Sequence, residues 1–241
     1  MTPTVLVEAC VESLEEALAA ERGGAKRLEL CASMDVGGTT PSAELFRAVR
    51  ARIRIPIAMM IRPRGGSFVY SSAELDSMRR DLDLAAELGA DVAVIGLLDD
   101  QARVDAARTR ELVARAGSIP VTFHKAFDVV DDQERDLDVL IDAGVTRVLT
   151  SGGADTAIAG ADALTRLVDR AAGRIIIMPG GKVRGDNVRE IVERTGVREV
   201  HTRCNTDDAR IREIIAAISA TDCSHDRCPA THVANRLPLR E

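Results

Sequence analysis

Two triplets of the form Glu-x-Cys offer carboxylate and thiol chemistry near the start of the chain. They are Glu8-Ala9-Cys10 and Glu29-Leu30-Cys31. Because side chains two residues apart on a β-strand share a face, each carboxylate would point in the same direction as its thiol. A carboxylate can serve as an acid, a base or a metal ligand, whereas a pair of thiolates suits a soft ion such as Cu(I).

Polar residues at the ends of the other predicted strands extend this set of candidates. Imidazoles and carboxylates supply acid, base or metal-ligand groups, and arginines and hydroxyls beside glycine-rich loops suit an anion. We expect catalytic groups at Glu8, Glu29, His124 and His201, and substrate-binding or anion-binding groups at Arg62, Arg64, Thr150 and Ser151. A copper(I) ion would take Cys10 and Cys31, with Met59 or Met60 adding a thioether. The alternative for both cysteines is simple burial as small core residues.

The elements that must position these residues alternate between short β-branched runs and amphipathic helical stretches. Strands are predicted over residues 5–10, 26–31, 55–62, 92–96, 120–124, 147–151, 174–178 and 199–204. Helices are predicted over residues 13–22, 41–52, 72–88, 105–116, 131–142, 162–172, 186–194 and 207–219. Eight strand–helix units predict an α/β fold, a (β/α)8 TIM barrel. An open doubly wound sheet is the alternative, but it usually carries a glycine-rich loop after its first strand, and this chain does not.

Helix boundaries and domain limits follow from local signals. Ser13 with Glu16 and Ser71 with Glu74 fit capping boxes, and Pro41 fits a first helical position. No linker or change in composition divides residues 1–219, so we expect one TIM-barrel domain there and a polar C-terminal extension over residues 220–241.

Composition narrows the classes of partner. The chain has 241 residues and a formal net charge of −6, which argues against nucleic acid or an anionic membrane and favours a small molecule, an ion or a protein. Neither a signal peptide nor an apolar stretch of membrane-spanning length is recognisable, so we expect a cytoplasmic protein. Its five cysteines form no regular framework and are interpreted as thiols.

The chemistry of a TIM barrel is found at the C-terminal ends of its strands. Alternation along the strands places six candidates at this mouth, with Thr122 below His124, and closure of the barrel brings His201 near Glu8; the six are Glu8, Cys10, Glu29, Cys31, Arg62 and His124. A network in which Arg62 neutralises both glutamates is the alternative to an active site. Asp128 would orient His124 or stabilise a turn, and Lys125 would point away from the mouth unless the strand has already ended.

The C-terminal extension contains four possible zinc ligands, Cys223, His225, Cys228 and His232. Their spacing matches no common zinc finger, in which a longer loop separates the paired ligands. We therefore favour an extension without a zinc site.

Taken together, the motifs resemble those of the CutC family of copper homeostasis proteins. The matching segments are Val7-Glu8-Ala9-Cys10, Arg27-Leu28-Glu29-Leu30-Cys31, Gly37-Gly38-Thr39-Thr40-Pro41-Ser42, Met60-Ile61-Arg62-Pro63-Arg64-Gly65-Gly66, Val121-Thr122-Phe123-His124-Lys125-Ala126-Phe127-Asp128, Arg147-Val148-Leu149-Thr150-Ser151-Gly152 and Ile177-Met178-Pro179-Gly180-Gly181. The resemblance implies a cytosolic homo-oligomeric barrel that binds Cu(I) through Cys10 and Cys31. Two features depart from it: the chain after His201 runs almost directly into the last helix, and the cysteine-containing extension has no counterpart.

Three hypotheses follow. The first is a CutC-like protein that binds copper(I) and contributes to copper homeostasis. The second is an enzyme that acts on a small anionic substrate through the glutamates and histidines of the mouth. The third is a catalytically silent scaffold.

Overall fold

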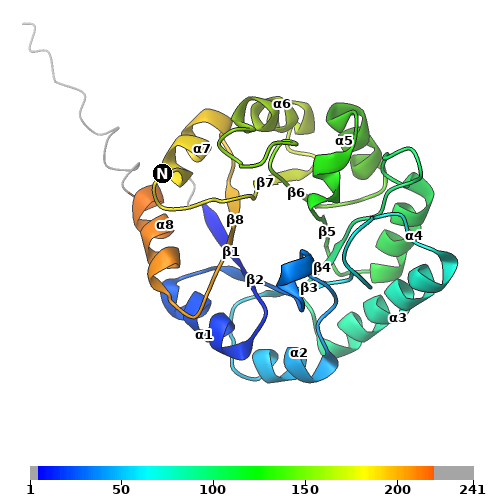
Figure 1. Ribbon diagram of the computed structural model, residues 1–241, viewed down its shortest axis with the longest axis horizontal. Coiled ribbons are helices and arrows are strands. Elements are labelled where there is room, and N and C mark those ends of the chain that lie inside the picture. Colours follow the sequence, from blue (N-terminus) through cyan, green and yellow to red (C-terminus); the bar gives the residue numbers. More distant parts are fainter. Residues whose placement is uncertain (1–4, 220–241) are drawn as a thin grey trace, which may run out of the picture.

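The computed structural model describes residues 5–219 and consists of a ring of parallel strands surrounded by helices (Figure 1). The strands are β1 (Leu6–Val11), β2 (Arg27–Leu30), β3 (Ile57–Met60), β4 (Val92–Ile95), β5 (Val121–Phe123), β6 (Arg147–Thr150), β7 (Ile176–Pro179) and β8 (Glu199–Arg203). The helices are α1 (Leu14–Gly23), α2 (Ala43–Arg50), α3 (Ser72–Leu88), α4 (Ala106–Ala116), α5 (Gln133–Asp142), α6 (Ala161–Ala171), α7 (Val188–Thr195) and α8 (Ala209–Ser219), with 3₁₀ turns η1 (Met34–Val36) and η2 (Lys125–Val129).

The strands follow the order β7-β6-β5-β4-β3-β2-β1-β8, and every hydrogen-bonded pair is parallel. Strand β8 lies next to β7 and nearly closes the ring, although no ladder joins these two strands within residues 5–219. The predicted single-domain TIM barrel is therefore confirmed. In the register of the first strands, Glu8 lies opposite both Arg27 and His201, and Cys10 lies opposite Glu29.

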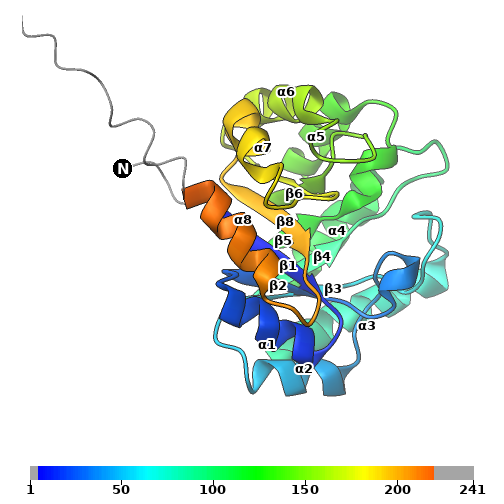
Figure 2. The same cartoon turned by 60° about the vertical axis from the view of Figure 1, so that its left-hand side comes forward.

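The core lies between the strands and the ring of helices. Alternate strand residues such as Val7, Ala9, Leu28 and Leu30 are fully or almost fully buried in it. Helix α8 packs beside both α1 and α7 and completes the outer ring (Figure 2). With these outward positions occupied by aliphatic side chains, the polar residues of the strands are left to face the barrel interior.

Most element boundaries lie within one or two residues of the predicted ones, and two of the differences concern segments that follow β2 and β5. Helix α2 begins at Ala43, two residues later than predicted, because the Ser42 hydroxyl caps it by accepting from the amide of Leu45. Strand β5 ends at Phe123, so His124 caps η2 and Lys125 is no longer constrained by strand alternation. The predicted capping box at Ser71 is complete.

The connection after β2 reaches over the barrel. A bridge between Ala32 and Thr39 closes this loop, and the amide of Met34 donates to the Glu12 carboxylate at 3.0 Å. Turn η1 is seen as the short blue segment inside the ring of strands in Figure 1. The loop brings Met34 and Val36 to the mouth.

Within residues 5–219 no helix combines the length and apolar character required to cross a membrane. The predicted extension and its possible zinc ligands fall outside the described residues.

Candidate functional site

A network of four charged side chains crosses the interior of the barrel. Arg27 forms an ion pair with Glu8 and another with Glu199 at 2.6 Å. Arg147 holds Glu199 through two hydrogen bonds of 2.6 and 3.0 Å. All four are at least nine-tenths buried. Two arginines and two glutamates therefore balance each other, as buried charges require.

This network corrects the pairing expected for Glu8, because Arg27 and not Arg62 neutralises it. Arg27, Arg147 and Glu199 were not among the site residues expected from the sequence. The signal was present in the alternation, because Arg27 shares a face with Glu29 and Glu199 shares one with His201.

His201 connects this network to the second glutamate of the mouth. Its Nδ1 lies 2.8 Å from Glu8 Oε1 and its Nε2 lies 3.8 Å from Glu29 Oε2. Burial alone would lower the pKa of His201, but the charge of Glu29 and hydrogen bonds with Cys10 and Glu8 raise it well above its ordinary value. Burial would raise the pKa of Glu8, yet the His201 hydrogen bond and the charge of Arg27 lower it to about 2. His201 is thus an imidazolium that donates to an ionised Glu8, and its place beside Glu8 is the one that closure of the barrel predicted.

The two cysteines of the Glu-x-Cys triplets lie side by side. Cys10 Sγ is 3.9 Å from Cys31 Sγ and 3.5 Å from the Met34 Sδ atom. Both thiols are free and buried. The hydrogen bond from Cys31 lowers the pKa of Cys10 to about 5 against the effect of burial, and His201 adds to this. The same hydrogen bond, together with burial, raises the pKa of Cys31 well above its ordinary value. Cys10 is therefore a thiolate at neutral pH.

These sulfur atoms are spaced for a soft metal ion. Two sulfurs 3.9 Å apart are close enough that Cys10 and Cys31 could together hold one soft metal ion. Met34 offers a thioether on the same side. Of the predicted thioethers, Met60 packs in the same cluster as both cysteines, whereas Met59 lies in the outer core. A second group, Glu8, Glu29 and His201, has ligand atoms within 4.8 Å of one another.

Arg62 supports the loops of the mouth. Its Nη1 donates to the carbonyls of Val36 at 3.1 Å and Gly38 at 2.8 Å, and its Nη2 donates to that of Gly66 at 3.2 Å. No carboxylate lies within 4.0 Å of Arg62 among residues 5–219. The alternative in which Arg62 neutralises both glutamates is therefore wrong. Arg64 lies elsewhere, in an ion pair of 2.5 Å with Glu74.

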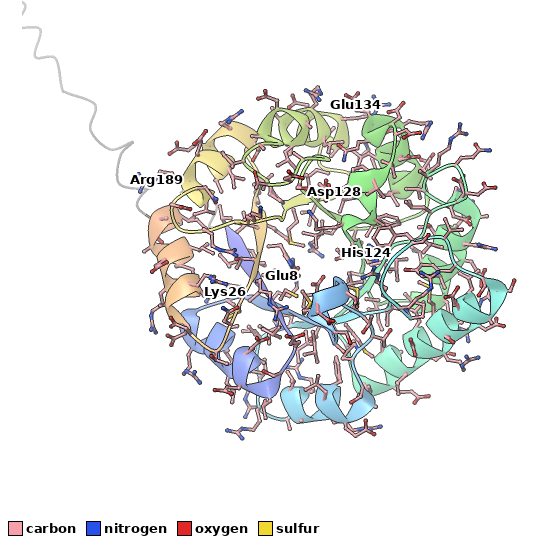
Figure 3. All side chains as sticks on the ribbon, viewed as in Figure 1. Glu8, Lys26, His124, Asp128, Glu134 and Arg189 are labelled. Atoms are coloured by element: carbon pink, nitrogen blue, oxygen red, sulfur yellow. The ribbon has the colours of Figure 1, made fainter. Side chains whose placement is uncertain are left out.

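His124 lies on the inner side of the ring, as the prediction required (Figure 3). Its Nδ1 accepts from the amide of Ala126 at 3.1 Å. Burial and the charge of Arg62 lower the pKa of His124 to about 3, so the ring is neutral and Nε2 carries the proton. Gly96 leaves room for this ring, because a methyl group there would overlap it.

Asp128 does not orient His124. Its carboxylate accepts from Thr150 Oγ1 at 2.5 Å and from the amide and hydroxyl of Ser151 at 2.8 and 3.0 Å. Lys125 turns toward the mouth, where its Nζ lies 2.8 Å from Asp128 and 3.0 Å from Ser151 Oγ. Thr150 and Ser151 are thus fully buried and held by Asp128.

A cavity of about 440 Å³ lies at the mouth. Cys10, Glu29 and His201 border it on one side of the barrel and His124 and Lys125 on another. The structure therefore brings Cys10, Glu29, Arg62, His124 and His201 to one cavity. The other predicted site residues are not among its lining residues: Glu8, Cys31, Arg64, Thr150 and Ser151.

Comparisons with known proteins agree with the resemblance. The model of the CutC family matches residues 5–206. A human protein named copper homeostasis protein cutC homolog is 44% identical over 196 residues, which are 81% of this chain and 72% of that one. A family protein CutC of Xanthomonas axonopodis pv. citri is 46% identical over 211 residues, 88% of this chain and 85% of its own.

Solved structures support the same fold. The structure of a protein described as the putative copper homeostasis protein CutC of Streptococcus agalactiae superposes with a TM-score of 0.79 and 36% identity, covering 82% of this chain and 98% of that one. A thiamine phosphate pyrophosphorylase of Pyrococcus furiosus covers 90% of this chain and 96% of its own, with a TM-score of 0.62 and only 14% identity, and so shows the shared barrel alone.

Proposed function

The chain belongs to the CutC family, and from that premise we propose that it binds Cu(I) between Cys10 and Cys31 in the cytoplasm and contributes to copper homeostasis. The observation that carries the proposal is the cluster of three sulfur atoms, with the two thiols 3.9 Å apart and a thioether 3.5 Å from one of them. Thiolate and thioether ligands select Cu(I) over harder ions.

The electrostatics of the site favour a cation there. Cys10 already carries a negative charge, because its pKa is lowered to about 5. Cys31 retains its proton in the free protein, since its pKa is raised. Binding of the ion would displace this proton, as metals do when they bind thiols. The second thiolate would then complete the ligand pair.

The copper role rests on the names of relatives as well as on the site. The human and mouse proteins, each 44% identical, are named copper homeostasis protein cutC homologs. Their names describe a process, and the sulfur cluster offers a physical means of taking part in it.

A Cu(I) titration against a chromophoric competing chelator, under reducing and anaerobic conditions, tests the proposal. The full chain carries Cys223→Ser and Cys228→Ser throughout, so that only three cysteines remain. Adding Cys10→Ser and Cys31→Ser should abolish the tight site. Cys204→Ser is the matched control because Cys204 is also a buried free thiol but donates to the Asn205 carbonyl. Unchanged stoichiometry in the Cys10, Cys31 variant would refute the proposal.

A further inference from the structure

The mouth contains an unusual concentration of polar atoms without partners. Five buried side-chain atoms in residues 5–219 lack a hydrogen-bond partner, namely Glu29 Oε1, Arg62 Nε, Tyr70 Oη, Thr109 Oγ1 and His124 Nε2. Three of the five belong to residues that line the cavity at the mouth. Because buried polar groups in native proteins are nearly always hydrogen-bonded, the two donors among these three atoms, on Arg62 and His124, are the groups that a bound molecule would complete.

His124 fixes the kind of atom that this molecule must present. Its Nδ1 accepts from the Ala126 amide, so in the neutral ring the proton resides on Nε2 and that nitrogen can only donate. The side chain is 4% exposed, and no acceptor reaches Nε2 among the described residues. The complementary group is an oxygen acceptor, such as a carbonyl.

Arg62 indicates the charge of the bound molecule. Four basic side chains line the cavity, of which His124 is neutral. Two of the other three already have carboxylate partners: Lys125 with Asp128 at 2.8 Å, and His201 with Glu8 at 2.8 Å. Arg62 is buried, and no carboxylate lies within 4.0 Å of it in residues 5–219. Three of its five N–H groups are donated to carbonyls, and Nε has no hydrogen-bond partner among the described residues. A single anionic group would compensate this cation.

The apolar side chains that line the cavity indicate the character of the remaining part of the ligand. Met34, Val36, Met60, Phe68 and Leu149 supply apolar surface between the polar groups. The volume of about 440 Å³ lies within the range of small-molecule pockets. An apolar body of moderate size would fill it.

We propose that the mouth binds a small organic monocarboxylate with an apolar body, whose carbonyl oxygen accepts from His124 Nε2–H and whose carboxylate compensates Arg62. This site is separate from the copper ligands in its chemistry, although it adjoins them. It also differs from the anion site expected from the sequence, since Arg64, Thr150 and Ser151 take no part.

Calorimetric titration of the metal-free full chain with phenylpyruvate as the probe tests the proposal. Phenylacetone lacks the carboxylate and 3-phenylpropionate lacks the carbonyl, while both keep the aromatic body. Phenylpyruvate should bind about tenfold or more tightly than phenylacetone and about threefold or more tightly than 3-phenylpropionate. If the protein does not prefer phenylpyruvate to phenylacetone, including the case in which neither binds, the assignment is wrong.

Two variants separate the groups. His124→Asn keeps a side-chain oxygen that can accept from the Ala126 amide. It removes the Nε2–H group that donates to the ligand. It should abolish the preference for phenylpyruvate over 3-phenylpropionate and leave the preference over phenylacetone. Arg62→Gln should abolish the latter preference, whereas the matched variant Arg64→Gln should retain it. If Arg64→Gln loses the preference instead, the assignment to Arg62 is wrong.

The wild-type comparison stands without these variants, should the loops held by Arg62 fail to fold in Arg62→Gln. Because every titration uses metal-free protein, its outcome does not depend on copper binding. The phenylpyruvate titration therefore tests this proposal, and the Cu(I) titration tests the proposed copper site, so the failure of one can be distinguished from the failure of the other.

Discussion

Glu8→Gln tests whether the charge network inside the barrel stabilises the fold. Glu8 is 1% exposed and ion-paired with Arg27, and its pKa is lowered from the ordinary 4.5 to about 2. At about 1.36 kcal/mol for each tenfold change in the acid constant, this corresponds to roughly 3 kcal/mol of stability from ionised Glu8. Breaking a buried ion pair costs about 3–5 kcal/mol in general, which agrees. We expect the variant to lose about 3 kcal/mol of unfolding free energy at pH 7.

The pH dependence gives a second, independent check. Because the folded-state pKa of Glu8 lies below its unfolded-state value, this stabilisation is complete above pH 4.5 and is lost as the pH falls toward 2. The difference between wild type and Glu8→Gln should therefore shrink over that range. Urea denaturation followed by circular dichroism at several pH values measures it.

Glu74→Gln is the matched control. The pKa of Glu74 is also lowered to about 2, by the Ser71 amide first and then by Arg64, but this carboxylate lies at the surface. Solvent screens such interactions, so its loss should cost much less. If Glu8→Gln costs no more than Glu74→Gln, or if the difference does not shrink in acid, the network does not stabilise the fold as reasoned.

Two further outcomes can be measured. The ultraviolet thiolate absorbance of metal-free protein should titrate near pH 5 and this step should disappear in Cys10→Ser, because Cys31 lowers the pKa of Cys10; a single step at ordinary thiol pH would contradict this. Gly160→Ala should lower the unfolding free energy by about 1–3 kcal/mol, because its methyl group would overlap the Ser151 carbonyl, a backbone atom that cannot easily move. Unchanged stability in thermal unfolding would show that the backbone there relaxes freely.

The fold was predictable because each strand and helix carries its own signal. The alternation of side chains between the two faces in Glu8-Ala9-Cys10 and Glu29-Leu30-Cys31 depends only on strand geometry, so the shared face of the carboxylates and thiols followed from position alone. The order of parallel strands then placed Cys10 beside Cys31 and His201 beside Glu8.

The partners of the long side chains were not predictable in the same way. Arg27 and Arg62 both face the interior, and which of them reaches Glu8 depends on the depth of each along the barrel and on carbonyls of distant loops. Met34 and Lys125 lie in turns, where side-chain direction follows from tertiary contacts and not from a repeat. Their presence at the mouth became visible only in the folded chain.

The balanced layer of Arg27, Arg147, Glu8 and Glu199 acts as a floor beneath the sulfur atoms. Such a floor closes the route toward the opposite end of the barrel, since an ion passing through it would have to separate paired buried charges. The cavity at the mouth, which both Cys10 and His124 line, gives access to the sulfur atoms from the other end of the barrel. If an ion binds Cys10 and Cys31 and a molecule then fills the cavity beside Cys10, the ion has to enter before that molecule and can leave only after it.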